Sequence, residues 1–130
     1  MPWVEVFAAF VVCHLVGDYL LQTNWQALNK RGGLGPDPRA RRALLSHIAS
    51  YTLAFVPALI WLADEIGAWA VATAALIAAP HLIQDDGRLL TLYMVRAKRT
   101  DGASIPAVAA AVDQTFHVLA LFLTALLVGD

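Results

Sequence analysis

Apolar residues dominate four long stretches of the chain, and each stretch approaches the length of a membrane-spanning helix. A helix needs about 20 mostly apolar residues to cross a hydrocarbon core about 30 Å thick. The stretches cover residues 3–21, 43–63, 66–83 and 105–128. Pro57 predicts a kink in the second stretch, because its ring nitrogen carries no hydrogen for the helical hydrogen bonds. The pattern predicts one domain over residues 1–130, an all-α polytopic membrane protein built as a bundle of four transmembrane helices.

The two halves of this pattern resemble each other. Each half is a helical hairpin, and the hairpins cover residues 3–63 and 66–128. The run His-Leu-Val-Gly-Asp at residues 14–18 is similar to His-Leu-Ile-Gln-Asp at residues 81–85, and His47 and His117 occupy matching positions. Membrane folds are often built from internal repeats of this kind. We therefore expect two duplicated hairpins.

The composition agrees with a membrane location. Of the 130 residues, 59% are apolar and 15% are charged, and the mean hydropathy is +0.62. These values exclude a disordered chain, and the charged residues are too few to cover the surface of so small a water-soluble domain. The single cysteine, Cys13, excludes an internal disulfide.

The basic residues predict the orientation in the membrane. All nine lie in the connections after the first and third stretches: Lys30, Arg31, Arg39, Arg41, Arg42, Arg88, Arg96, Lys98 and Arg99. Cytoplasmic loops carry an excess of lysine and arginine, so we expect both basic loops in the cytoplasm and both termini outside. Residues 88–99 predict a connector that lies on the membrane surface, with a specific lipid-binding element as the alternative. We expect membrane lipid as a partner, and no nucleic acid.

Histidine and aspartate residues interrupt the apolar stretches in a regular way. Each predicted helix contains one histidine, and three of these histidines have an aspartate four residues away. Residues at this spacing share one face of a helix. Their positions along the helices place all of them in one layer of the cytoplasmic half of the bundle. The candidate metal ligands in this layer are His14, Asp18, His47, His81, Asp85, Asp113 and His117.

This polar layer predicts a metal site. An ionised aspartate near the middle of a membrane costs about 2.5–3.5 kcal/mol to insert, and a bound divalent cation offsets that cost. Imidazole and carboxylate groups bind zinc, which we expect first, and also manganese or iron. The candidate ligands exceed the three or four that one catalytic zinc takes, which favours two ions over one. The alternatives are hydrogen bonds between helices without any metal and, less favoured, a haem.

Further polar residues flank the layer. Candidates to orient the ligands are Gln22, Gln84 and Gln114. Asp86 is a candidate catalytic base, or an ordinary carboxylate at the membrane surface. Arg42 and Arg88 are candidate catalytic residues that would hold an anionic group, or arginines that only reach toward the membrane surface.

These motifs resemble those of a known family. The run from His14 to Thr23, a later Leu-x-x-His47, His81-x-x-x-Asp85 and Asp113-Gln114-x-x-His117 are similar to the small bacterial integral-membrane proteins of domain-of-unknown-function family 3307. Gln84 departs from the apolar residue expected there and leaves Asp86 as an alternative ligand to Asp85. The motif style is also similar to inner-membrane metal-dependent hydrolases, in which histidine and aspartate residues on membrane helices are taken to bind metal. The resemblance implies a bacterial inner-membrane protein with a metal site.

The function that we expect from these patterns is metal-dependent hydrolysis at the cytoplasmic leaflet, on a phosphate-containing or lipid-linked anion. The alternative is a divalent-metal or proton carrier without hydrolytic activity. A carrier would need to form a homo-oligomer, because four helices are few for a transporter. A third possibility is a structural protein in which the polar layer only joins the helices.

Overall fold

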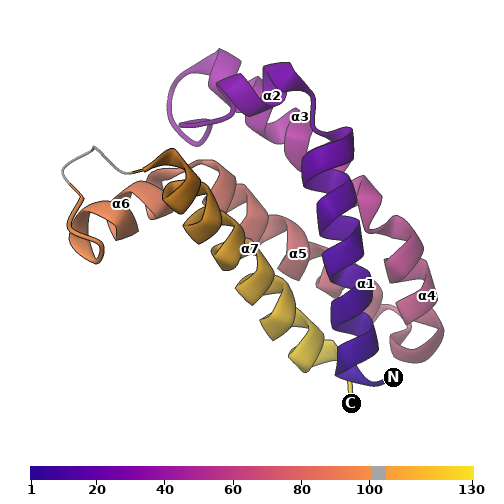
Figure 1. The fold of residues 1–130 in the computed structure, drawn as a ribbon. Helices are drawn as coiled ribbons and strands as arrows, with labels where there is room; N and C mark the ends of the chain where they lie inside the picture. The colour runs from indigo at the N-terminus through magenta and orange to yellow at the C-terminus, as the bar shows by residue number, and fades with distance from the viewer. Residues whose placement is uncertain (101–104) are drawn as a thin grey trace.

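The computed structural model describes residues 1–100 and 105–130, and helices are the only regular secondary structure in these ranges (Figure 1). The elements are α1 (Trp3–Leu15), the π-helix η1 (Val16–Leu21), α2 (Asn24–Asn29), α3 (Pro38–Ala54), α4 (Val56–Ile66), α5 (Trp69–Asp85), α6 (Arg88–Arg96) and α7 (Pro106–Val128). The prediction of an all-α protein is therefore confirmed.

Two helical segments are long and apolar enough to cross a membrane. They are Trp3–Leu21, which joins α1 and η1 over 19 residues, and α7 with 23 residues. The pair α3 and α4 makes a third if the two helices together form one bent span. The remaining predicted span falls in α5, which has 17 residues and is not among these candidates. Two or three spans are consistent with a membrane protein.

The bend between α3 and α4 confirms the kink predicted at Pro57. The two helices differ in direction by 55° across Phe55. Pro57 lies in the first turn of α4, where a missing N–H leaves no helical hydrogen bond unmade. Residues 38–66 thus form two helices that point in different directions rather than one straight helix.

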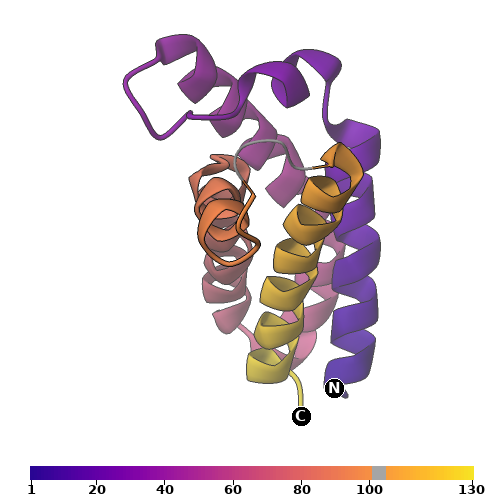
Figure 2. The same cartoon turned by 60° about the vertical axis from the view of Figure 1, so that its left-hand side comes forward.

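The long helices pack side by side, and the two termini lie at the same end. Helix α7 packs on α1 and on α5, and α5 also packs on α3 and α4 (Figures 1 and 2). The amine of Met1 lies 2.6 Å from carboxylate oxygens of both Glu65 and Asp130, which joins the termini to the turn between α4 and α5. Helices α2 and α6 lie at the opposite end (Figure 1).

A buried apolar core fills the half of the molecule near the termini. Its largest members are Phe10 of α1, Tyr51 of α3, Phe55, Leu62 of α4 and Leu121 of α7, each no more than 3% exposed. In a membrane the lipid is as apolar as these side chains, so close van der Waals packing is what holds the helices together. Many leucine and valine side chains are also exposed on the outer surface, which is consistent with a membrane protein.

The loop between α2 and α3 folds back over the start of α6. The backbone N–H of Gly32 donates to the carbonyl oxygen of Asp86 (2.9 Å), and the N–H of Leu34 donates to Oδ1 of the same residue (2.8 Å). Gly33 lies so close to Leu44 that a Cβ atom at this position would come within 2.6 Å of the Leu44 side chain. These contacts fix the loop, and with it Lys30, above the end of α5.

Candidate metal centre

Four buried side chains meet where η1, α3 and α5 come together. Asp18 comes from η1, His47 from α3, and His81 and Asp85 from successive turns of α5. All four are buried, and one nitrogen or oxygen atom of each lies within 4.8 Å of the others. We call these residues the four-donor group. The prediction that buried histidine and aspartate residues form a group able to hold a metal is therefore confirmed.

The spacing within the four-donor group is that of metal ligands. Nε2 of His47 lies 3.2 Å from Oδ1 of Asp18 and 2.9 Å from Oδ2 of Asp85. Nε2 of His81 lies 3.3 and 3.2 Å from the same two oxygens, and the two Nε2 atoms are 3.1 Å apart. Four ligands about 2.0–2.1 Å from a tetrahedral zinc would lie about 3.3 Å from one another. Five of the six distances between the donor atoms are therefore close to the edges of a tetrahedral zinc site, and the two carboxylate oxygens lie within 4.8 Å of each other.

The hydrogen bonds available in the protein do not satisfy this group. Among the described residues, Oδ1 of Asp18 is buried and accepts no hydrogen bond, although the Nε2 atoms of His47 and His81 lie 3.2 and 3.3 Å away, because their geometry is not that of hydrogen bonds. Nδ1 of each of these histidines is also buried without a hydrogen-bond partner. A buried carboxylate oxygen without a donor is costly, and a cation among the four atoms would remove that cost. A metal on Nε2 of His47 or His81 would leave the Nδ1–H of that ring without an acceptor, so the Asp18 oxygen is the atom that favours an ion. The donor set therefore fits a divalent ion.

Asp85 also belongs to a second group of possible ligands. Its Oδ1 atom lies 3.1 Å from Nε2 of His117, and these two residues form with Asp113 a group whose donor atoms lie within 4.8 Å of one another. Nδ1 of His117 donates to the backbone oxygen of Asp113 (2.7 Å), which leaves the Nε2 lone pair facing Asp85. We call Asp85, Asp113 and His117 the three-donor group. The carboxylate of Asp85 thus belongs to both groups. Its Oδ2 atom faces His47 and His81, and its Oδ1 atom faces His117.

Lys30 contacts the centre from the loop between α2 and α3. Its Nζ atom donates to Oδ2 of Asp85 at 2.6 Å, and its side chain is 15% exposed. The position of Lys30 in a basic loop predicts only membrane orientation, and no motif around it signals a role in the site. Only the folding of the loop over α5 brings this cation to the aspartate.

His14 lies beside the four-donor group rather than in it. Its Nε2 atom donates to Oε1 of Gln114 (2.9 Å), and its Nδ1 atom accepts from the hydroxyl of Tyr51 (3.0 Å). Both ring nitrogens are therefore occupied, and the nearest approach to Asp18 is 3.7 Å, between Nδ1 and Oδ2. Of the predicted ligands, the structure brings the other six into the two groups.

Tyr51 positions two of the histidines, a role that the sequence did not indicate. Its ring stacks on the ring of His81, with centroids 3.4 Å apart and an angle of 6° between the planes, while its hydroxyl bonds to His14. Gly17 makes room for this ring, because a Cβ atom there would lie 2.6 Å from Cδ2 of Tyr51. The π-helical turn η1, which contains Gly17, is a form of helix that often occurs at functional sites.

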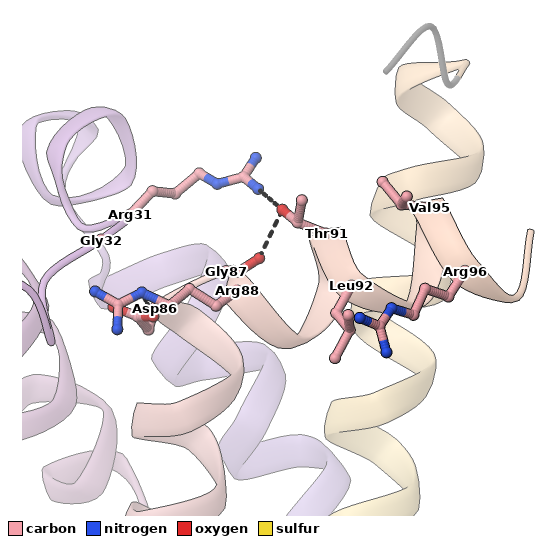
Figure 3. A pocket seen from close by; sticks show the side chains of 9 residues that line it. All are labelled: Arg31, Gly32, Asp86, Gly87, Arg88, Thr91, Leu92, Val95 and Arg96. Atoms are coloured by element: carbon pink, nitrogen blue, oxygen red, sulfur yellow. Dashed lines mark hydrogen bonds and ion pairs between the residues drawn. The ribbon is translucent and has the colours of Figure 1, made fainter. Parts of the chain in front are cut away.

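The three predicted catalytic residues lie outside both groups. Asp86 is buried, holds the loop by the hydrogen bond from Leu34, and accepts from Nε of Arg88 at 3.2 Å. Figure 3 shows the Arg88 side chain directed toward Asp86. The guanidinium of Arg42 lies over the ring of Trp25, 6.0 Å from its centroid. Asp86 therefore anchors the loop after α2, and none of the three residues belongs to either donor group.

A cavity of about 420 Å³ opens beside the shared aspartate. Its walls include Asp85 and Asp113 of the three-donor group together with Lys30. The cavity thus gives a ligand access to Asp85 and Asp113 from outside the helices, and the ammonium of Lys30 lies in the same wall.

The sequence was also compared with known proteins. One family, described as "Protein of unknown function (DUF3307)", matches residues 6–129. No curated protein matches the chain, and no solved structure matches it. The family match covers nearly the whole chain and agrees with the resemblance seen in the motifs. The chain belongs to the DUF3307 family of proteins of unknown function.

Proposed function

We propose that this protein is a membrane-embedded hydrolase that depends on divalent metal ions. The observation that carries the proposal is the meeting of four ligand atoms from Asp18, His47, His81 and Asp85, with Asp85 shared by a second group. Two histidine nitrogens and two carboxylate oxygens suit zinc, which we propose as the ion, with one ion in each group.

The difference between the two groups supports catalysis over a purely structural role. The four-donor group offers a complete tetrahedral set of ligands, as structural zinc sites do. The three-donor group offers one ligand fewer and lies against the cavity at Asp85 and Asp113. Catalytic zinc sites have three protein ligands and keep one position open. We therefore assign the reaction to the three-donor group.

The residues around the centre have distinct roles in this proposal. A bound divalent ion supplies Lewis acidity toward the substrate and activates water for hydrolysis. Lys30 lies in the cavity wall and binds the anionic part of the substrate by charge-assisted hydrogen bonds. Tyr51 fixes the plane of the His81 ring by stacking on it. Asp86 holds the loop that carries Lys30, rather than acting as a base.

The proposed setting is a four-helix bundle in a bacterial inner membrane. Two spans, Trp3–Leu21 and α7, are long enough to cross a membrane by themselves. In this proposal α5 forms a third span, and the bent pair of α3 and α4 forms a fourth. The basic loops lie at the end opposite the termini, so the positive-inside rule places them in the cytoplasm (Figure 1). The cavity beside Lys30 would then face the cytoplasmic leaflet, where a lipid-linked phosphate is an accessible anion.

A repeated contact supports the proposed duplication of the hairpin. Asp18 and Asp85 are matching residues of the two halves, as are His47 and His117. Oδ1 of Asp18 lies 3.2 Å from Nε2 of His47, and Oδ1 of Asp85 lies 3.1 Å from Nε2 of His117. The same aspartate–histidine pair thus joins the two helices of each hairpin.

The proposal is tested by metal analysis followed by activity screening. Protein purified in detergent should contain zinc, and it should release product from a panel of phospholipids and isoprenoid phosphates only when metal is present. Asp85→Asn, which changes the one residue common to both groups, should lose both metal and turnover, whereas Thr115→Ala, an exposed change on α7, should keep both. Bound metal without turnover of any compound would contradict hydrolysis. Metal-dependent flux into liposomes without turnover would favour the carrier instead.

A further inference from the structure

A second cavity, away from the donor groups, lies between the loop after α2 and helix α6 (Figure 3). Its volume is about 640 Å³, and its lining contains three arginines, Arg31, Arg88 and Arg96, against one acidic residue, Asp86. The carboxylate of Asp86 is already occupied by Leu34 and Arg88. The cavity therefore presents a net positive charge.

Arg31 is held in place at the wall of this cavity. One of its terminal nitrogens donates to Oγ1 of Thr91 at 3.2 Å, and that hydroxyl donates to the carbonyl oxygen of Gly87 at 3.0 Å (Figure 3). Gly87 has a φ of +84°, and a Cβ atom there would lie 2.8 Å from Nε of Arg31. The glycine thus lets the guanidinium approach the backbone closely, and the hydrogen bond to Thr91 directs the side chain along the wall of the cavity.

Two of the arginines have no acidic partner among the described residues. No carboxylate in residues 1–100 and 105–130 lies within ion-pair distance of Arg31 or Arg96. Each guanidinium carries five N–H donors in a planar fork, an arrangement that matches the oxygens of a phosphate. Helix α6 also begins at this cavity without a side-chain cap, and its first N–H groups favour an anion nearby.

The face of α6 that lines the cavity is amphipathic. Arg88, Leu92 and Arg96 follow one another at intervals of four residues, so they form one row along the helix, and Val95 lies beside them. Leu92 and Val95 are about half exposed. A row with cations at both ends and apolar groups between them fits a ligand that has a charged group joined to hydrocarbon.

We propose that this cavity binds the phosphate of an anionic phospholipid. Arg31 and Arg96 bind the phosphate oxygens, and Leu92 and Val95 contact the adjoining hydrocarbon. The cavity contains no residue of the donor groups, although Arg31 and Gly87 also line the cavity beside Asp85, and the proposal does not rest on the proposed hydrolysis. It makes α6 a specific lipid-binding element rather than a connector that only lies on the membrane.

Native mass spectrometry of the full chain in detergent tests this site. The probes are phosphatidylglycerol, phosphatidylcholine with the same acyl chains, and inorganic phosphate. We expect the wild type to retain phosphatidylglycerol in preference to phosphatidylcholine. Arg31→Gln and Arg96→Gln should each weaken that retention about tenfold, because each removes one charged partner of the phosphate. Arg39→Gln removes the same charge from an exposed residue outside the cavity and should change nothing.

Three outcomes would overturn the proposal. The first is equal retention of the two lipids by the wild type. The second is a loss in Arg39→Gln as large as in Arg96→Gln, which would indicate unspecific attraction. The third is arginine-dependent binding of inorganic phosphate without any preference for phosphatidylglycerol, which would make the ligand a free anion. Melting temperatures of all variants show whether each is folded, and either arginine variant alone is sufficient for the test.

Discussion

The ammonium of Lys30 and the carboxylate of Asp85 form a 2.6 Å ion pair on the oxygen that also faces His47. Asp85 comes from the last turn of α5, and Lys30 comes from a loop more than fifty residues earlier in the chain. Without a metal, Lys30 is the cation that compensates this buried carboxylate. A metal held by the four-donor group would compete with this ammonium for the carboxylate of Asp85.

We predict opposite effects of Lys30→Met on the metal-free and metal-loaded protein. Removal of the ammonium leaves Asp85 buried without a cation, and breaking such a pair costs about 3 kcal/mol. The melting temperature should therefore fall in the presence of a chelator. It should fall much less with zinc, because the ion takes over the compensation and binds more tightly once the competing charge is gone. Lys98→Met, an exposed control, should change neither value. Equal losses in both conditions would contradict the shared oxygen.

The bridging position of Asp85 predicts the number of ions in two variants. Asp85→Asn removes a charged ligand from both groups and should reduce the metal content from two ions per chain to none. His117→Ala affects only the three-donor group and should leave one ion. Elemental analysis of protein dialysed against dilute zinc measures both values. Two ions in Asp85→Asn would show that the carboxylate does not bridge.

His14→Ala should destabilise the protein without removing metal. The substitution leaves the Tyr51 hydroxyl and the Gln114 amide oxygen without their partner, and an unsatisfied buried polar group costs about 1–3 kcal/mol. Denaturant titration in detergent measures this loss, and elemental analysis measures the zinc. A loss of zinc in a variant that remains folded would restore His14 as a ligand, as its spacing from Asp18 predicts.

Gly17→Ala should weaken metal binding through Tyr51. The new methyl group would lie 2.6 Å from the Tyr51 ring and 3.3 Å from its Cα atom, so the ring must move away from its stack on His81. Overpacking of this kind costs about 1–3 kcal/mol. Isothermal titration with zinc should show a lower affinity. Thr115→Ala, an exposed change on α7, is the control and should leave the affinity unchanged.

Much of the fold follows from the hydrophobic pattern, and the remainder depends on local hydrogen bonds. The apolar stretches predicted the long helices and Pro57 predicted the bend, because both effects act within a few residues of their cause. Helix α2 was missed, although Thr23 and Gln26 form a capping box that a search for helix starts would find. The π-helical form of η1 was also missed, since hydrophobic spacing does not reveal one extra residue in a turn.

The spacing of residues within single helices predicted part of the candidate site. His81 and Asp85 are four residues apart on one helix, and both enter the four-donor group as that spacing indicates. His14 and Asp18 have the same spacing, but Tyr51 and Gln114 arrive from other helices and occupy the His14 ring. Spacing within a helix cannot reveal which partners other helices supply. Lys30 was missed for the same reason.

Two adjacent residues, Asp85 and Asp86, have different partners: the first faces the donor groups, and the second holds the loop that delivers Lys30. If an ion binds at Asp85, as we propose, the order of loop docking and ion binding would matter when the protein folds. Before the loop docks on Asp86, the carboxylate of Asp85 is open to an incoming ion. After docking, the ion must compete with an ammonium that is already in place. A nascent chain that meets zinc early would therefore load more readily than the finished protein.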